Sequence, residues 1–115
     1  PLLRLLWQAS QAKQISIVTS ELTLLETLVA PFKQNNQILI KSYESLLTKT
    51  EVQLLPITVD ILRQAASLRA QYNFKTPDAI HAASALACSC IQIITNDTVF
   101  SRLPGLQVVI LKDLL

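Results

Sequence analysis

Hydrophobic positions along the chain follow two spacings, one typical of helices and one typical of short strands. Apolar residues at steps of three and four predict helices over residues 2–13, 21–30, 34–49, 59–72 and 76–89. Short apolar runs rich in β-branched residues predict strands over residues 15–20, 52–58, 91–95 and 107–111. Because strands and helices alternate and the strands are continuously apolar, we expect an α/β fold with a mostly parallel sheet, covered by helices on both faces.

Hydroxyl and proline residues mark the expected helix ends. Ser20 and Thr58 are each placed to cap the helix that follows, and Pro31 is expected to end the helix over residues 21–30. The segment 76–78, Thr-Pro-Asp, combines a capping hydroxyl, a proline at the first helical position and an acid in the first turn. The helix that begins there is rich in alanine, which lets it lie close to the sheet.

The composition is that of a small folded domain. Of the 115 residues, 50% are hydrophobic and 16% are charged, whereas disorder requires low hydrophobicity and high charge. No apolar run approaches the ~20 residues of a membrane span, so we expect a cytoplasmic protein with no membrane partner. Cys88 and Cys90 are too close in sequence to favour a disulfide and lack the partners of a zinc site, so we interpret them as thiols.

Three acidic residues are predicted to lie at one edge of the sheet. The helix of a strand-helix-strand unit runs antiparallel to its strands, so its N-terminus lies at the edge where the strands end, which is the ligand-binding edge of open α/β sheets. Asp78 begins a helix, Asp97 follows the strand over residues 91–95, and Glu26 lies in the second turn of the helix after the first strand. Glu26 also lies on the apolar stripe of its helix, where an uncompensated charge is costly to bury.

Carboxylates that converge at one edge favour a site for a hard divalent cation, because Mg²⁺ and Mn²⁺ take oxygen ligands together with water and substrate phosphate. Each acid alone has a simpler explanation: Asp78 as a helix N-terminal acid and Asp97 as a turn residue. Glu26 could pair with a lysine, or its stripe could be turned partly to solvent. Their combination favours the metal site. The chain has one histidine and one glycine, so a histidine metal cluster, a P-loop and a dinucleotide-binding motif are excluded.

Three segments resemble, in order and spacing and over nearly the whole chain, the PIN-domain family, in particular the VapC-like toxins of bacterial toxin–antitoxin pairs. They are IVTSELTLLETLVAP, LRAQYNFKTPDAIHAASAL and IITNDTVFSRLPGLQVVIL. The resemblance implies a single domain over residues 1–115 with three layers, α/β/α, around a central parallel sheet. It also implies a metal-dependent endoribonuclease that uses Mg²⁺ or Mn²⁺ to hydrolyse RNA phosphodiester bonds.

The resemblance assigns roles to particular residues. The implied metal ligands and catalytic acids are Glu26, Asp78 and Asp97. The implied auxiliary residues are Thr95 and Asn96, and the basic residues placed to contact RNA phosphates are Lys75 and Arg102. The net charge is +2, so the chain carries +5 once the three acids are set aside, which suits a phosphate-backbone partner.

The resemblance also implies partners. The expected RNA substrate is a tRNA or ribosomal RNA, and the expected protein partner is an antitoxin that covers the acidic edge. A homodimer is expected as well, and the apolar first helix, which includes Leu5 and Trp7, is a candidate for its interface.

The chain departs from the family pattern at its start. No segment matches the first strand of the family, which carries a further aspartate, so we expect the sequence to be N-terminally incomplete. If the molecule lacks that strand, metal binding and nuclease activity are expected to be weak. The alternative is therefore a non-catalytic PIN-like module that binds RNA or protein, and a third option is another metal hydrolase that acts on small phosphoesters.

Overall fold

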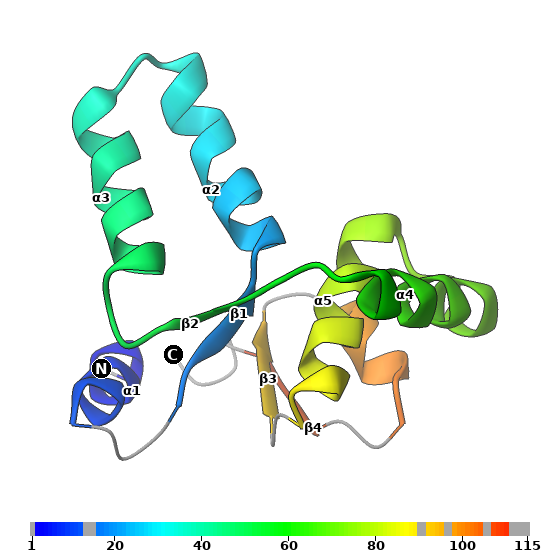
Figure 1. The fold of residues 1–115 in the computed structure, drawn as a ribbon. Coiled ribbons are helices and arrows are strands. Elements are labelled where there is room, and N and C mark those ends of the chain that lie inside the picture. Colours follow the sequence, from blue (N-terminus) through cyan, green and yellow to red (C-terminus); the bar gives the residue numbers. More distant parts are fainter. Residues whose placement is uncertain (1, 13–15, 90–91, 96–97, 105–106, 111–115) are drawn as a thin grey trace. The chain divides into compact units, whose positions relative to one another are not determined.

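The computed structural model describes residues 2–12, 16–89, 92–95, 98–104 and 107–110 (Figure 1). The chain forms two compact units, which divide between Pro56 and Ile57. The elements of the first unit are α1 (Leu2–Gln11), β1 (Val18–Ser20), α2 (Leu22–Lys33), α3 (Gln37–Thr48) and β2 (Gln53–Leu55). Those of the second are α4 (Val59–Tyr72), α5 (Thr76–Ala87), β3 (Gln92–Thr95), the 3₁₀-helix η1 (Thr98–Arg102) and β4 (Gln107–Ile110).

The first unit joins a parallel strand pair to a helical hairpin. Strand β1 pairs with β2 in parallel, with Ser20 opposite Leu55, and α2 packs against α3. Helix α2 begins directly where the strands end, because the Glu21 N–H donates to the Leu55 carbonyl at 2.8 Å. The buried Ser20 hydroxyl also accepts from the Leu22 N–H at 3.1 Å. The start of α2 is therefore fixed at the carboxyl ends of both strands, as the sequence predicted.

Pro31 does not end α2, so that prediction was wrong. The helix continues through Lys33, with Pro31 buried inside it. A proline within a helix lacks the N–H that would bond to the carbonyl four residues earlier. In α2 this affects only the last turn, and the chain reverses immediately afterwards at Asn35, whose φ is 53°. Asn36 then caps α3 by accepting from the Leu39 N–H at 3.1 Å.

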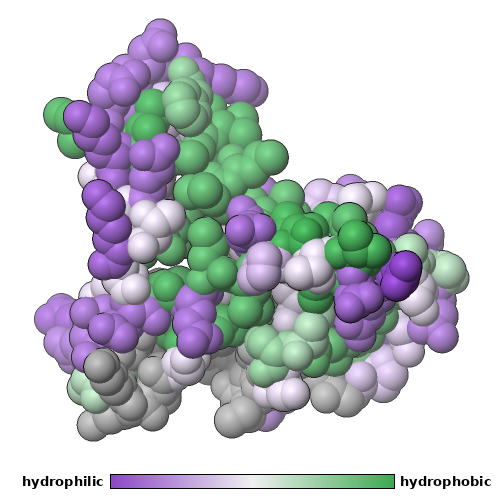
Figure 2. Space-filling model, viewed as in Figure 1, coloured by the Kyte–Doolittle hydropathy of each residue, from purple (hydrophilic) through white to green (hydrophobic). Residues whose placement is uncertain are grey.

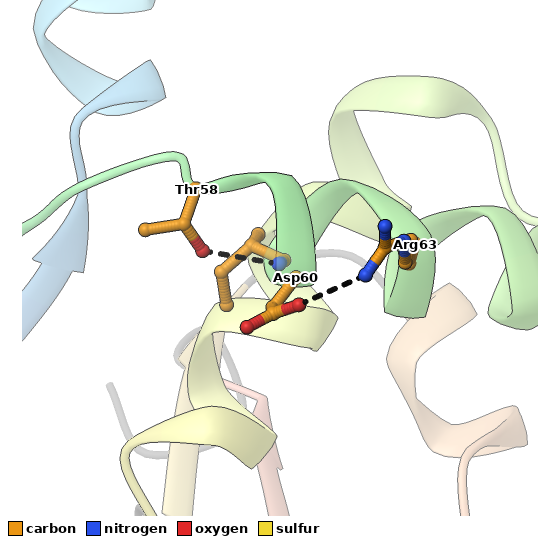
Figure 3. Close-up of polar contacts among 4 residues, drawn as sticks. Thr58, Asp60 and Arg63 are labelled. Atoms are coloured by element: carbon orange, nitrogen blue, oxygen red, sulfur yellow. Dashed lines mark hydrogen bonds and ion pairs between the residues drawn. The ribbon is translucent and has the colours of Figure 1, made fainter.

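Helix α4 has the boundaries that the sequence predicted. The Thr58 side chain accepts a hydrogen bond from the Ile61 N–H at 3.2 Å and caps its first turn (Figure 3). Asp60, in the same turn, pairs with Arg63 at 3.4 Å. Both side chains of that pair are largely exposed, so it contributes little to stability. The helix ends at Asn73, which adopts the left-handed conformation that terminates helices.

The core of the second unit lies between α4 and α5. The two helices pack against each other, and α5 contributes small side chains with no exposed surface, at Ala79, Ala82 and Ala83. Small residues allow two helices to approach closely, so the alanine-rich pattern accounts for this packing. Strands β3 and β4 pair in parallel from Gln92–Gln107 to Thr95–Ile110. Both strand pairs are thus parallel, in agreement with the predicted α/β class.

Two features of the second unit were not predicted. The 3₁₀-helix η1 covers residues 98–102, for which the sequence predicted no element. Cys88, expected to be a thiol, is disulfide-bonded, and Cys90 lies outside the described residues. The thiol interpretation relied on the close spacing of Cys88 and Cys90 in the sequence, but α5 ends at Ala87 and the residue between the two cysteines, Ser89, has a φ of 56°. Among the described helices, none has the length and apolar character needed to cross a bilayer.

Candidate functional site

Asp78 lies in the first turn of α5 and is half-buried. Lys75 precedes the helix in an extended conformation, with φ −70° and ψ 156°, and Pro77 follows within the first turn. A negative charge in the first turn of a helix is favoured by the partial positive charge of the unpaired N–H groups there. The chain therefore presents Asp78 at the N-terminal end of α5, as the sequence predicted.

The start of α5 differs from the prediction in one respect. The helix begins at Thr76, with Lys75 at the cap position and no side-chain cap hydrogen bond. The Thr76 hydroxyl, expected to be the cap, instead accepts from Arg69 Nη1 at 2.9 Å. Sequence reasoning missed Arg69. The signal that could have found it is a basic residue in the last turn of a helix, where only three residues connect that helix to the next one.

Aromatic packing holds the start of α5 against the segment that follows β3. Phe74, two residues before α5, is 2% exposed, and its ring centroid lies 6.1 Å from that of Phe100 in η1. The ring of Tyr72 lies at the same distance on α4. Arg102 Nη1 also donates to the Tyr72 carbonyl at 3.5 Å. Residues that shortly precede Asp78 in the sequence thus contact residues that shortly follow Asp97 in the sequence.

Glu26 lies in the second turn of α2, in the first unit, and its side chain is exposed. The hydroxyls of Thr19 and Thr23, which are 2.7 Å apart, link the end of β1 to the first turn of that helix. The stripe that carries Glu26 is not buried as expected but turned partly to solvent, which is the alternative that the sequence left open. Val29 is 45% exposed and Leu25 is 62% exposed, so this part of α2 is open to solvent and imposes no burial cost on the carboxylate.

The remaining predicted residues of the metal site are Thr95, Asn96 and Asp97. Thr95 ends β3 and its backbone pairs with Ile110, but Asn96 and Asp97 lie outside the described residues. Within the part of the chain that is described, no three side chains of histidine, cysteine, aspartate or glutamate cluster as metal ligands would. The convergence of Glu26, Asp78 and Asp97 therefore stays a prediction, as do the auxiliary roles of Thr95 and Asn96.

The basic residues predicted to contact RNA lie at the Asp78 end of the second unit. Lys75 precedes α5 and Arg102 ends η1, and both are exposed. One Arg102 nitrogen is engaged with the Tyr72 carbonyl, at the long end of the hydrogen-bond range. That contact links η1 to the end of α4 and leaves the guanidinium accessible to solvent.

The residue chemistry fits a hard divalent ion. The predicted ligands are all carboxylates, and Mg²⁺ and Mn²⁺ prefer oxygen donors that leave room for water. Asp78 and Glu26 each lie within the first two turns of a helix, and the start of α2 coincides with the carboxyl ends of a parallel strand pair. No observation on the described residues conflicts with this donor set.

Comparison with known proteins gives consistent results. The sequence profile of the family described as "PIN domain" matches residues 4–106. A chain in a solved toxin–antitoxin complex from Klebsiella pneumoniae is similar to this one, with 30% sequence identity and a TM-score of 0.64. The similarity covers 78% of this chain and 69% of that chain. No curated protein sequence matches the chain significantly.

Proposed function

The chain belongs to the PIN-domain family, and from that premise we propose that it is a metal-dependent endoribonuclease and the toxin of a toxin–antitoxin pair. Members of the family are generally nucleases that use divalent ions. Within this chain, the observation that carries the proposal is the contact between Phe74 and Phe100. It joins the Asp78 end of α5 to the segment after β3, which is the edge where the acids of such a nuclease belong.

In the proposed site, Glu26, Asp78 and Asp97 hold Mg²⁺ or Mn²⁺, with Thr95 and Asn96 as auxiliary residues. A bound divalent ion supplies positive charge near the scissile phosphate and favours deprotonation of the attacking water. The chain contributes the negative charge that retains the ion. The start of α5 adds its partial positive charge at the same place, which is suited to binding an anionic phosphate group.

The charge distribution favours a nucleic-acid substrate, and we propose RNA. Lys75 and Arg102 are exposed cations near the Asp78 end of the second unit, where each would contact a backbone phosphate. Such contacts strengthen binding without reading the base sequence. Together with the net charge of +2, they suit a phosphate-backbone partner. The choice of a structured RNA, a tRNA or a ribosomal RNA, comes from the family to which the chain belongs.

An antitoxin is the protein partner we propose. The similar chain from Klebsiella pneumoniae was solved in a toxin–antitoxin complex. In this chain, Leu25, Val29 and Phe32 form an exposed stripe along α2, with exposed fractions of 62%, 45% and 57%. Figure 2 shows hydrophobic surface along the α2 side of the helical hairpin. A stripe of this kind is typical of a protein-binding surface.

We propose a homodimer as well, with α1 in its interface, where Leu5 is 62% exposed.

The test is cleavage of a structured RNA by the full chain with Mn²⁺, compared with hydrolysis of a small phosphoester. We expect cleavage of the RNA and no hydrolysis of the phosphoester. Cleavage should be lost in Glu26→Gln and in Asp78→Asn, because an amide lacks the negative charge that retains the ion. Asp60→Asn is the matched control, since Asp60 is also an acid in the first turn of a helix and should leave cleavage unchanged.

Two outcomes would replace this proposal. RNA binding without cleavage by the unsubstituted chain would favour the non-catalytic binding module. Hydrolysis of the small phosphoester without RNA cleavage would favour another class of metal hydrolase.

A further inference from the structure

We propose that Arg69 is a positioning residue, which fixes the end of α5 that carries Asp78 against the last turn of α4. Arg69 lies in the segment LRAQYNFKTPDAIHAASAL, but the sequence predicted no role for it in the site. The functional part of this inference rests on the proposed nuclease activity, because Asp78 matters for cleavage only if that activity is real. Its structural part rests on contacts within the second unit alone.

The guanidinium of Arg69 spans the connection between the two helices. Its Nε donates to the Phe74 carbonyl at 3.0 Å, and its Nη1 donates to the Thr76 hydroxyl at 2.9 Å. These acceptors lie on either side of Lys75, one before α5 and one in its first residue. The planar guanidinium holds two donors in a fixed geometry, so both acceptors are set in position relative to each other.

The main chain of Arg69 closes the same connection. Its carbonyl accepts from the Asn73 N–H at 3.0 Å, and Asn73 has the left-handed conformation, with φ 58° and ψ 39°. Phe74 is buried against aromatic rings on α4 and η1. Arg69 thus bonds to residues 73, 74 and 76 in succession, which leaves little conformational freedom in the three residues between the helices.

These contacts determine where Asp78 is presented. The Thr76 hydroxyl is held by Arg69 and does not cap the helix. The first backbone bond at this end of α5 instead runs from the Ala79 N–H to the Lys75 carbonyl at 2.9 Å. Asp78 lies inside that first turn. If Arg69 releases Phe74 and Thr76, the turn loses its anchor on α4, and the carboxylate moves with it.

Arg69 could act instead as a phosphate contact, because it is exposed. The two roles differ in their kinetics. A residue that only binds phosphate contributes equally to substrate and transition state, so its loss raises KM. A residue that positions a metal ligand affects the chemical step, so its loss lowers kcat with KM unchanged.

The test compares Arg69→Lys with Arg63→Lys in the full chain. Arg63 is the matched control, since it lies on the same helix and forms an ion pair with the exposed Asp60. Lysine keeps the charge but lacks the forked donors. We expect Arg69→Lys to accelerate hydrogen exchange of the Ala79 amide by about tenfold, as two hydrogen bonds are weakened, and to change the residual dipolar coupling of the Asp78 N–H. Arg63→Lys should change neither.

Substitutions at the acceptor separate positioning from general destabilisation. Thr76→Val removes the hydroxyl with little change in shape and should accelerate hydrogen exchange of the Ala79 amide. Thr76→Ser keeps the hydroxyl, so exchange should stay as slow as in the unsubstituted chain. In RNA cleavage, Arg69→Lys should lower kcat by roughly tenfold or more while KM is unchanged.

The proposal is overturned if Arg69→Lys leaves both NMR measurements as they are in Arg63→Lys, or if it raises KM without lowering kcat. Absence of RNA cleavage in the unsubstituted chain is a different failure. It would reject the proposed nuclease and the role of Arg69 in cleavage, while the NMR measurements would still decide whether Arg69 fixes the start of α5.

Discussion

Phe74 is the most deeply buried large side chain among the described residues, with 2% of its surface exposed. It lies in the short connection between α4 and α5, where most chains place polar residues. Its ring packs between those of Tyr72 and Phe100. A single residue therefore joins the end of one helix, the start of the next and the segment that follows β3.

Replacing Phe74 with alanine should destabilise the protein strongly. The change removes most of a buried ring and leaves a cavity between three elements, which typically costs about 3–5 kcal/mol. Denaturation with urea, followed by circular dichroism, measures the free energy of unfolding. Val59→Ala is the control: Val59 is 63% exposed, and its loss should change stability by less than about 0.5 kcal/mol. Equal effects of the two substitutions would contradict the packing described here.

The candidate site shows what residue-level reasoning could and could not predict. The position of Asp78 in a first helical turn followed from Thr-Pro-Asp, because each of these residues has a strong local preference. For Arg69 the sequence offers only a general signal, a basic residue in the last turn of a helix, because its role depends on the distance between its side chain and acceptors in the next helix. The expected burial of Glu26 failed for a related reason, since periodicity locates a stripe on a helix but not what covers it.

At the scale of elements, helices with strong end signals were predicted best. Helix α4 begins after a capping threonine and ends at an asparagine in the left-handed conformation, and its predicted boundaries were confirmed. In α2, local preference was misleading, because a proline near the end of a helix affects only one turn. The 3₁₀-helix η1 spans five residues, too few to show a periodicity.

The Thr58 cap gives a prediction for α4. Thr58→Ala removes the acceptor for the Ile61 N–H and should lower the free energy of unfolding by about 1 kcal/mol, a typical value for a lost N-cap. Thr58→Ser retains the hydroxyl and should stay close to the original stability. Urea denaturation checks both, and a Thr58→Ala protein as stable as Thr58→Ser would show that the cap contributes nothing.

At the scale of the whole molecule, the family and the fold class were predicted from the sequence, because three motifs occur in a fixed order along nearly the entire chain. The PIN-domain profile then matched residues 4–106. Whether the three acids meet is harder to predict. It depends on where distant segments lie in three dimensions, and no local preference of a residue fixes that distance.

The proposed RNA contacts predict a change in salt dependence. Lys75→Ala and Arg102→Ala should each weaken RNA binding and reduce the slope of log affinity against log salt by roughly 0.7–0.9, because each removes one phosphate contact. Fluorescence anisotropy with a labelled RNA at several salt concentrations measures the slope. Lys41→Ala, an exposed cation on α3, is the control. Equal slopes for all three variants would reject specific roles for Lys75 and Arg102.

The central claim is that the carboxylates of Glu26, Asp78 and Asp97 meet around one divalent ion. Paramagnetic broadening by Mn²⁺ in the NMR spectrum of the full chain tests this most directly, because it detects even weak binding and acts only on nearby nuclei. The account predicts that amide signals around residues 26, 78 and 97 broaden together at the lowest Mn²⁺ concentrations, and that Asp78→Asn suppresses the broadening around all three. Broadening near only one of these residues, or scattered over unrelated acids, would contradict it.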